Sequence, residues 1–314
     1  MRPNRMKKTI LLFGSMLLAL GFLAGCSIGG DQASNTDKIK IASAVTTESQ
    51  IMGYMLKHMI EYYSDEQVEL INNLGSSTVL HQAMLNGDAN ISATRYTGTE
   101  LTGALNAELI KDPAEALDFV QNAFQERYNQ TFFDKYGFEN TYAFMVTQET
   151  AQQYNLNKIS DLAAIATDIE AGVDTSWLSR EGDGFKAFVQ EYGFQFKRTY
   201  PMQIGLVYDA VQAGEIDIVL GYTTDGRIAS YDLKVLEDDL NFFPPYETSV
   251  LATNEILEAK PELREILQRL VGKISTDKMQ ELNYLADNNL LEPSVVAENF
   301  LIENNYFSNE EGEE

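Results

Sequence analysis

The chain alternates between two hydrophobic patterns, which predict strands that alternate with helices. Lys38–Ala44 is a short apolar run of strand length, and Glu48–Tyr63 carries Ile51, Met55 and Met59 at the spacing of one helix face. Further elements are predicted at Val68–Asn72, Ser76–Asn86, Ala89–Ala93, Ile169–Asp174, Gly182–Tyr192, Gly205–Ala213 and Ile216–Gly221. Such alternation predicts doubly wound α/β sheets with mostly parallel strands, which bind ligands at the carboxyl ends of the strands.

Two other apolar segments, Asn140–Thr147 and Glu247–Asn254, are predicted as strands that link the halves of the molecule. About 100 residues with their own alternation lie between them, and after Asn254 the pattern is mainly helical to about Asn304. A lobe that the chain enters and leaves by adjacent strands forms a hinge, and two hinged lobes form a closing cleft. The alternative from the pattern alone is one continuous domain.

The predicted boundaries follow from these two crossover strands. The first lobe is predicted at residues 38–143 and 248–308, and the second at residues 144–247. Residues 309–314 carry four glutamates and are predicted to be a disordered acidic tail. Because the chain has one cysteine, no intramolecular disulfide can form, and hydrophobic burial has to stabilise the fold.

The amino-terminal segment has the features of an export signal. Four basic residues precede an apolar run at Ile10–Leu23, which is short for a membrane span of roughly 20 residues. The sequence Leu-Ala-Gly-Cys then ends at Cys26 and resembles a bacterial lipobox. The resemblance implies a signal peptide at residues 1–25, a lipid on Cys26 and a polar tether at residues 26–37. The alternative is an ordinary secretory leader with an incidental cysteine.

Charge excludes several classes of partner. Without residues 1–25 the chain carries 19 basic against 47 acidic residues, a net charge of −28. Such a surface repels phosphate backbones, so we expect no nucleic-acid binding. It is equally unsuited to electrostatic adhesion on anionic lipid, which leaves the predicted lipid chain as the membrane anchor.

Signatures of catalysis are absent from the sequence. His58 and His81 lie in predicted helices without metal-ligand spacing and are expected to be surface or boundary residues. There is no Gly-x-Ser-x-Gly motif, and the segment Glu181–Phe185 fits neither a phosphate-binding loop nor a calcium-binding loop. We therefore expect a binding protein rather than an enzyme, with no metal and no cofactor.

Three segments resemble a known family. These are Arg95–Leu101 (RYTGTEL), Gly205–Ile228 (with its Tyr-x-Thr-Asp-Gly turn) and Phe242–Leu251 (FFPPYETSVL). In this order and spacing they resemble the substrate-binding lipoproteins of bacterial osmoprotectant importers, which bind glycine betaine, carnitine and choline. The likeness runs from about Lys38 to Phe307. It implies a two-lobe type II periplasmic-binding-protein fold, in which two crossover strands form the hinge.

The resemblance also implies the site. Four tyrosines of the family surround a trimethylammonium group, and their motifs fall here on Tyr96, Tyr142, Tyr222 and Tyr246. The sequence by itself could not select them from its 16 tyrosines. A quaternary ammonium has no N–H donors, whereas its methyl groups lie well against the negative faces of aromatic rings.

The opposite end of the ligand is less defined by the sequence. Thr99 matches a threonine of the family that can donate to a carboxylate or hydroxyl, although it could instead cap a helix that begins near Glu100. Some relatives carry a glutamine where this chain has Ala44, which cannot make that polar contact. Thr46 or Thr47 could replace it.

Together these features predict an extracytoplasmic, lipid-anchored, monomeric protein. It would capture a quaternary ammonium osmoprotectant between its lobes and deliver it to the permease of an ABC importer. The alternatives are a binding protein for an amino acid or another small cation, and a surface lipoprotein without a transport role, such as a scaffold or adhesin. A surface hydrolase is a further alternative, against which the missing nucleophile and base argue.

Overall fold

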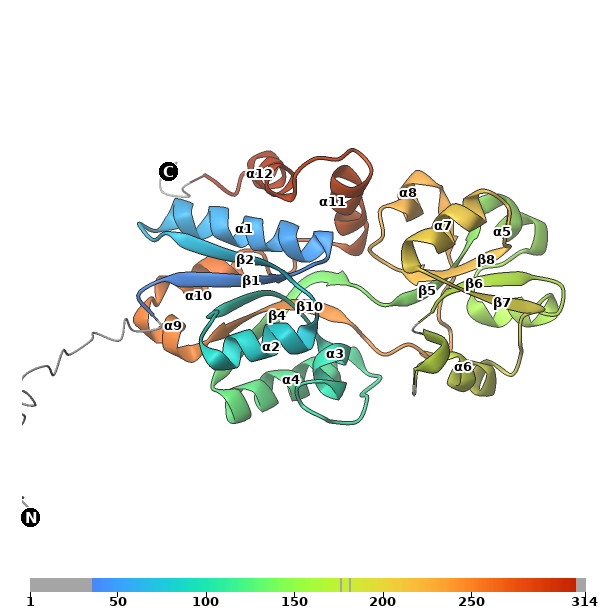
Figure 1. Cartoon of the computed structure of the whole chain (residues 1–314), viewed down its shortest axis with the longest axis horizontal. Helices are drawn as coiled ribbons and strands as arrows, with labels where there is room; N and C mark the ends of the chain where they lie inside the picture. The colour runs from blue at the N-terminus through green and yellow to red at the C-terminus, as the bar shows by residue number, and fades with distance from the viewer. Residues whose placement is uncertain (1–35, 176, 181, 309–314) are drawn as a thin grey trace, which may run out of the picture. The chain divides into compact units, whose positions relative to one another are not determined.

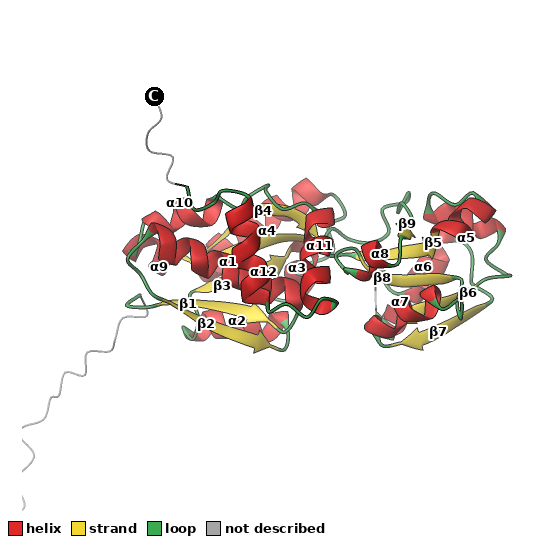
Figure 2. Cartoon of the chain, turned by 90° about the horizontal axis from the view of Figure 1, so that it is seen from above, coloured by secondary structure: helices red, strands yellow, loops and turns green. Residues whose placement is uncertain are grey.

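A computed structural model describes residues 36–175, 177–180 and 182–308 of the chain (Figure 1). The predicted signal peptide, Cys26 and the acidic tail lie outside these residues, as does nearly all of the predicted tether. The described residues form two five-stranded sheets. Helices and strands alternate through both of them (Figure 2).

The first sheet has the strand order β2-β1-β3-β10-β4. Its strands are β1 (Ile39–Ala44), β2 (Val68–Leu74), β3 (Ile91–Tyr96), β4 (Gln130–Glu139) and β10 (Glu247–Thr253). β1 is parallel to β2 and β3, and β10 is antiparallel to both β3 and β4. Four strands of this sheet therefore point the same way and β10 opposes them, as expected of a mostly parallel sheet.

Helices cover both faces of the first sheet (Figure 1). They are α1 (Thr47–Tyr63), α2 (Ser77–Asn86), α3 (Thr97–Thr102), α4 (Pro113–Tyr128), α9 (Asn254–Ala259), α10 (Glu262–Gln268), α11 (Thr276–Asp287) and α12 (Pro293–Glu303). Alternation along β1 separates the faces, because Ile41 packs in the cluster with α1 and Ala42 in the cluster with α2 and α4. Buried apolar side chains on both faces are typical of a doubly wound sheet.

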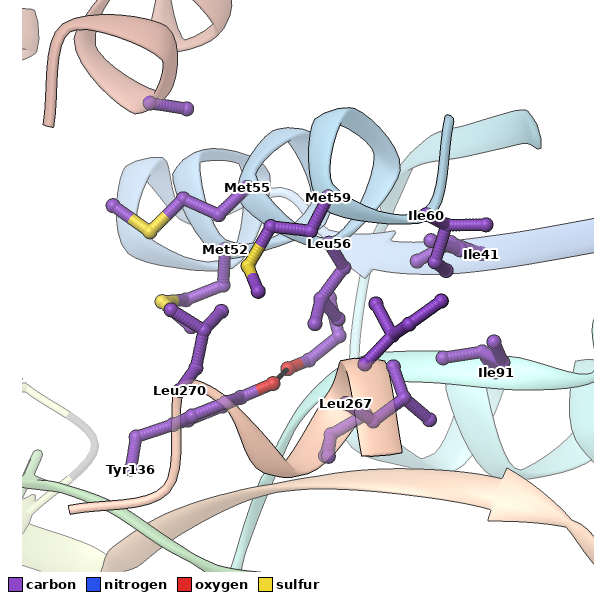
Figure 3. Close-up of a cluster of buried hydrophobic side chains, with 14 of the residues drawn as sticks. Ile41, Met52, Met55, Leu56, Met59, Ile60, Ile91, Tyr136, Leu267 and Leu270 are labelled. Atoms are coloured by element: carbon purple, nitrogen blue, oxygen red, sulfur yellow. Dashed lines mark hydrogen bonds between the residues drawn. The ribbon is translucent and has the colours of Figure 1, made fainter. Parts of the chain in front are cut away.

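The larger core of the first lobe forms beneath α1. Figure 3 shows Met52, Leu56 and Met59 of this helix with Ile41 and Ile91 of the sheet, all fully buried. Full burial of such side chains contributes about 1.5–3 kcal/mol each before conformational entropy is subtracted. The hydrophobic spacing that predicted the helix therefore marks the face on which this lobe is stabilised.

Local signals explain where several helices begin and end. The hydroxyl of Ser76 accepts a hydrogen bond from the backbone N–H of Val79 at the start of α2. Gly87 ends that helix with φ of 75°, in the left-handed region that glycine adopts without steric cost. Thr147 and Thr253 likewise cap α5 (Gln148–Tyr154) and α9 directly after strands β5 (Tyr142–Thr147) and β10.

The second sheet has the strand order β7-β6-β8-β5-β9. Its elements are β5 (Tyr142–Thr147), α5 (Gln148–Tyr154), η1 (Ile159–Ala164), β6 (Glu170–Asp174), η2 (Trp177–Ser179), α6 (Phe185–Tyr192), β7 (Arg198–Met202), α7 (Ile204–Gln212), β8 (Ile218–Tyr222), α8 (Arg227–Ser230) and β9 (Leu233–Val235). β6 is parallel to β7 and β8, while β5 is antiparallel to β8 and β9. This sheet therefore repeats the arrangement of the first, with β5 as its opposing strand.

The core of the second lobe is aromatic on one face of its sheet. Phe144 of β5 is fully buried, and its ring centroid lies 5.8 Å from Trp177, 5.0 Å from Phe188 and 5.6 Å from Phe196. The next residue along β5, Met145, packs in the cluster on the opposite face with α7. Each lobe therefore has its own hydrophobic cores, as the alternation of elements predicts.

The chain crosses between the sheets at two adjacent segments. Glu139, at the end of β4, pairs with Glu247 at the start of β10, and the N–H of Asn140 donates to the carbonyl of Tyr246 over 3.2 Å. The two predicted crossover strands belong to different sheets, since β5 lies in the second and β10 in the first. The crossing itself is the short extended chain on either side of this contact.

Most predicted elements lie within one to three residues of the observed ones. The sequence interpretation omitted α4 and the long edge strand β4, whose alternation is interrupted by Asp134 and Lys135 and by Gly137. The two sheets with their helices confirm the predicted α/β fold. The predicted boundaries between the lobes stay a prediction. Among the residues that the structure describes, no helix is both long and apolar enough to cross a membrane.

The aromatic cluster generates a prediction for stability. Phe144→Ala should lower the free energy of unfolding by about 3–5 kcal/mol, because the truncation leaves a cavity among packed rings. Leu206→Ala on α7 is the matched control, since Leu206 is 56% exposed and its loss should change stability by less than about 0.5 kcal/mol. Urea unfolding followed by circular dichroism measures both, and equal effects would contradict the assignment of this core.

Candidate functional site

A cavity of about 250 Å³ is lined by residues from both lobes. Its lining residues are Ala44, Val45, Thr46, Gly75, Ser76, Ser77, Tyr96, Thr99, Asn140, Tyr142, Arg180, Tyr222 and Tyr246. In the first lobe they come from the carboxyl ends of β1 and β3 and from the start of α2 and α3. This is the sheet edge at which a doubly wound fold is expected to bind ligands.

All four tyrosines singled out from the sequence line this cavity, and so does Thr99. Tyr142 and Tyr222 are direct partners in the antiparallel pairing of β5 with β8, which sets their ring centroids 5.0 Å apart. Tyr96 ends β3, and Tyr246 immediately precedes β10. The pairing and the crossing between sheets therefore bring together side chains that are up to 150 positions apart in the sequence.

The structure explains why a glycine, Gly98, stands in the Tyr-Thr-Gly-Thr motif at residues 96–99. A Cβ atom at Gly98 would lie 2.8 Å from the carbonyl oxygen of Pro245 and 3.1 Å from the ring of Tyr246. Thr97 donates its hydroxyl to the same carbonyl over 3.0 Å. Only glycine lets α3 begin this close to Tyr246, so the motif joins two parts of the cavity wall.

Two of the tyrosine hydroxyls donate to carboxylates, and a third donates to another tyrosine. Tyr96 donates to Glu48, and Tyr142 donates to Asp174 over 2.6 Å. Tyr222 donates to the hydroxyl of Tyr142 over 3.5 Å, which is a long contact. These hydrogen bonds fix the orientation of the rings through their hydroxyls, while the residues themselves line the cavity.

The pKa values of Tyr96, Tyr222 and Tyr246 are all raised, so these three tyrosines stay neutral at physiological pH. Burial raises the pKa of Tyr96 well above its usual value, and Glu48 raises it further. Burial also raises the pKa of Tyr222, and it raises that of Tyr246 to about 12 with the help of Asp183. The cavity therefore offers uncharged aromatic rings rather than phenolates.

Arg180 is a lining residue that the sequence interpretation missed. Its guanidinium carbon lies 5.5 Å from the centroid of the Tyr142 ring, and its Nη2 donates to the hydroxyl of Tyr246 over 2.7 Å. Two hydrogen bonds of 3.0 and 2.8 Å join it to Asp183. Burial disfavours its charge, but these bonds outweigh burial and raise the pKa of Arg180. The only sequence signal was an arginine beside the glycine-containing segment at residues 181–185.

Of the residues considered for the polar end of the ligand, some line the cavity and others do not. Ala44 and Thr46 line it, whereas Thr47 donates its hydroxyl to Asp287 over 2.6 Å. Asn140, also missed, lines the cavity and donates to Glu48 over 2.9 Å. The alternative that Thr99 caps a helix is wrong, because α3 begins at Thr97 with Tyr96 in the capping position.

The histidines do not contribute to this cavity. His58 is partly buried, as expected of a boundary residue. The expected surface or boundary position is wrong for His81, which is 7% exposed and contacts the rings of Phe124 and Tyr128 edge-on. Burial lowers the pKa of His81, and the charge of Arg95 lowers it further. Within the described ranges, no cluster of His, Cys, Asp and Glu could hold a metal ion.

The arrangement has two chemically distinct ends. Aromatic faces of four tyrosines suit a cation whose charge is spread over methyl groups. The Arg180 guanidinium suits a carboxylate, which it can bind with two parallel hydrogen bonds. Glu48, Asp174 and Asp183 are buried and are not among the described residues that line the cavity; their carboxylates contact the hydroxyls of the lining tyrosines.

Comparison with solved structures supports the same fold. A structure described as a glycine betaine/carnitine/choline ABC transporter is 55% identical and superposes with a TM-score of 0.84, covering 86% of this chain and all of that one. Apo YehZ from Escherichia coli shares the fold at 20% identity, with a TM-score of 0.74 over 86% of this chain and 99% of that one.

Sequence comparison identifies the family. The carnitine transport binding protein OpuCC of Listeria monocytogenes is 55% identical over 302 residues, which are 96% of this chain and 98% of that protein. Residues 37–303 match the family described as OpuAC, the substrate-binding domain of the ABC-type glycine betaine transport system. Such domains are extracytoplasmic, serve a permease and bind solutes without catalysing a reaction. The chain belongs to this family of ABC-transporter substrate-binding proteins.

Proposed function

We propose that the protein captures quaternary ammonium osmoprotectants in a cage formed by Tyr96, Tyr142, Tyr222 and Tyr246. The observation that carries the proposal is the convergence of these tyrosines on one cavity, with a guanidinium already over the ring of Tyr142. A ring that accepts the delocalised charge of arginine has the chemistry to accept a trimethylammonium group. Glycine betaine, carnitine and choline are the proposed ligands.

The position of the carboxylates favours a quaternary over a primary ammonium. A primary ammonium brings three N–H donors that need acceptors within the cavity. The nearby carboxylates accept hydrogen bonds from Tyr96, Tyr142 and Arg180 instead. An amino acid would leave its N–H groups facing rings, whereas a trimethylammonium group has no donor to satisfy. This argues against the alternative of an amino-acid-binding protein.

Arg180 and Thr99 are proposed to bind the other end of the ligand. A carboxylate of glycine betaine or carnitine would accept hydrogen bonds from the guanidinium and from the threonine hydroxyl. Ala44 cannot contribute, and Thr46 is the lining residue beside it that can. The similarity to OpuCC, whose name assigns carnitine to it, supports a zwitterionic ligand for this chain.

Capture is proposed to occur by closure of the two lobes about the crossing at residues 139–142 and 244–247. Closure would remove water from the cage, which raises the strength of a cation–π contact from about 0.5–1 to around 2 kcal/mol. The ligand would then pass to the permease. From the sequence, we propose a lipid on Cys26 as the membrane anchor after removal of residues 1–25, and a monomeric protein.

The cage predicts losses of affinity on truncation of its rings. Tyr96→Ala and Tyr222→Ala should each weaken the binding of glycine betaine about 5–30-fold, because each removes one aromatic face from the cation. Calorimetric titration of the chain from Ser27 onward with glycine betaine, carnitine, choline and proline measures this loss and ranks the ligands.

The matched control is Tyr154→Ala, which removes a tyrosine that is 42% exposed on α5 and should leave affinity unchanged. If both cage variants fold and bind with the affinity of the parent, the cage is wrong. If the parent chain binds none of the four compounds, an amino-acid ligand or a role without transport gains support.

The proposed role of Arg180 predicts that its substitution changes the affinities for ligands with and without a carboxylate differently. Arg180→Gln should weaken glycine betaine and carnitine about tenfold or more, because a charged hydrogen bond to the carboxylate is lost. Choline should bind equally well or better, since it has no carboxylate and the competing cation is gone. Calorimetry with the three ligands measures the split. Arg269→Gln is the control, as Arg269 lies over the ring of Tyr63 outside the cavity. An equal loss for all three ligands would contradict the proposed role of Arg180.

A further inference from the structure

Carboxylates form a second row behind the tyrosines of the cavity. Glu48 accepts the hydroxyl of Tyr96, and Asp174 accepts that of Tyr142. Asp183 is 3.4 Å from the hydroxyl of Tyr246. The three carboxylates are buried, with exposed fractions of 2%, 9% and 2% in the same order. Burying three carboxylates is costly unless hydrogen bonds and nearby charges compensate, so their position requires an explanation.

Compensation differs between the carboxylates. Arg180 forms an ion pair with Asp183 over 2.8 Å, so that the two charges largely cancel. In the part of the chain that the structure describes, no lysine, arginine or histidine pairs with Glu48. Its support comes from the Tyr96 hydroxyl, the amide of Asn140 and its position in the first turn of α1, where the helix dipole favours an anion. One oxygen of Glu48, Oε2, is buried without a hydrogen-bond partner.

We infer that Glu48 and Asp174 are positioning residues that act through Tyr96 and Tyr142 to strengthen the binding of the ligand's ammonium group, by a larger factor for a cation such as choline than for a zwitterion. The inference rests on the proposed function of the cage. Each carboxylate fixes one ring through its hydroxyl, and each adds negative potential at the hydroxyl edge of a ring that the cation would contact.

Two physical effects of each carboxylate both favour the binding of a cation. A phenol that donates to a carboxylate is polarised toward it, which increases electron density in the ring, as hydrogen bonds in series polarise one another. The carboxylate also attracts the cation directly, and this attraction would be screened little once the proposed closure of the lobes excludes water. Neither effect requires the carboxylate to touch the ligand. The same field repels a carboxylate on the ligand, so a zwitterion gains less from it than a cation.

Charge removal with little change of shape tests the inference. In Glu48→Gln the acceptor for Tyr96 is retained and the charge is lost, and Asp174→Asn makes the same change behind Tyr142. Each variant should bind choline about tenfold more weakly and glycine betaine by a clearly smaller factor. The measured quantity is the ratio of the two dissociation constants from calorimetry. A displaced ring would weaken both ligands by the same factor, because they share the trimethylammonium group, and would leave this ratio unchanged.

A matched control removes one charge from a similar pair elsewhere. Asp209 accepts the hydroxyl of Tyr231 over 2.8 Å on the surface of the second lobe, away from the cavity, so Asp209→Asn should leave both constants and their ratio unchanged. Circular dichroism establishes that each variant folds. If Glu48→Gln does not fold, Asp174→Asn alone decides the inference.

The outcomes separate the inference from the function on which it rests. A choline-to-betaine ratio that shifts in either carboxylate variant, and not in the control, supports the inference. An unchanged ratio in the folded variants overturns it, whether both affinities fall or neither does. Failure of the parent chain to bind choline and glycine betaine would instead overturn the proposed function.

Discussion

The arrangement of the cavity depends on the place where the chain crosses between the two sheets. The hydrogen bond from Asn140 to Tyr246 and the pairing of Glu139 with Glu247 hold the outgoing and returning segments side by side. Asn140 and Tyr246 are themselves lining residues, and Tyr142 follows two positions later. The backbone contact that connects the lobes therefore also positions part of the binding site, so a rotation of one lobe against the other would act directly on the cavity wall.

The cavity combines apolar faces with buried polar support. Phenol rings present surfaces that need no hydrogen-bond partner, while the hydroxyls of Tyr96 and Tyr142 donate to buried carboxylates. This division explains how a strongly acidic protein can offer an uncharged cage to a cation. It also explains why tyrosine suits the site better than phenylalanine, since a phenylalanine ring would lack the hydrogen bond that fixes its orientation.

Much of the fold could be predicted from short-range pattern. Helix α2 was placed to within a residue because Ser76 and Gly87 are local start and stop signals. The edge strand β4 was not recognised, because charged residues and a glycine interrupt its alternation, and its partner β10 lies more than 100 positions away. His81 is buried by Phe124 and Tyr128 of α4. Because α4 was not predicted from the sequence, His81 was expected near the surface.

The sequence by itself determined the alternating α/β architecture, the acidic charge and, through family motifs, the identity of four tyrosines. These are properties of local periodicity, composition and short motifs. Only the tertiary structure decided that Arg180 and Asn140 line the same cavity and that Glu48 and Asp174 accept hydrogen bonds from Tyr96 and Tyr142. The physical reason is that these contacts join residues from different elements, sometimes from different lobes. Glu48 lies in the first turn of α1. From the sequence alone, an acidic residue at such a position is explained by its favourable interaction with the helix dipole.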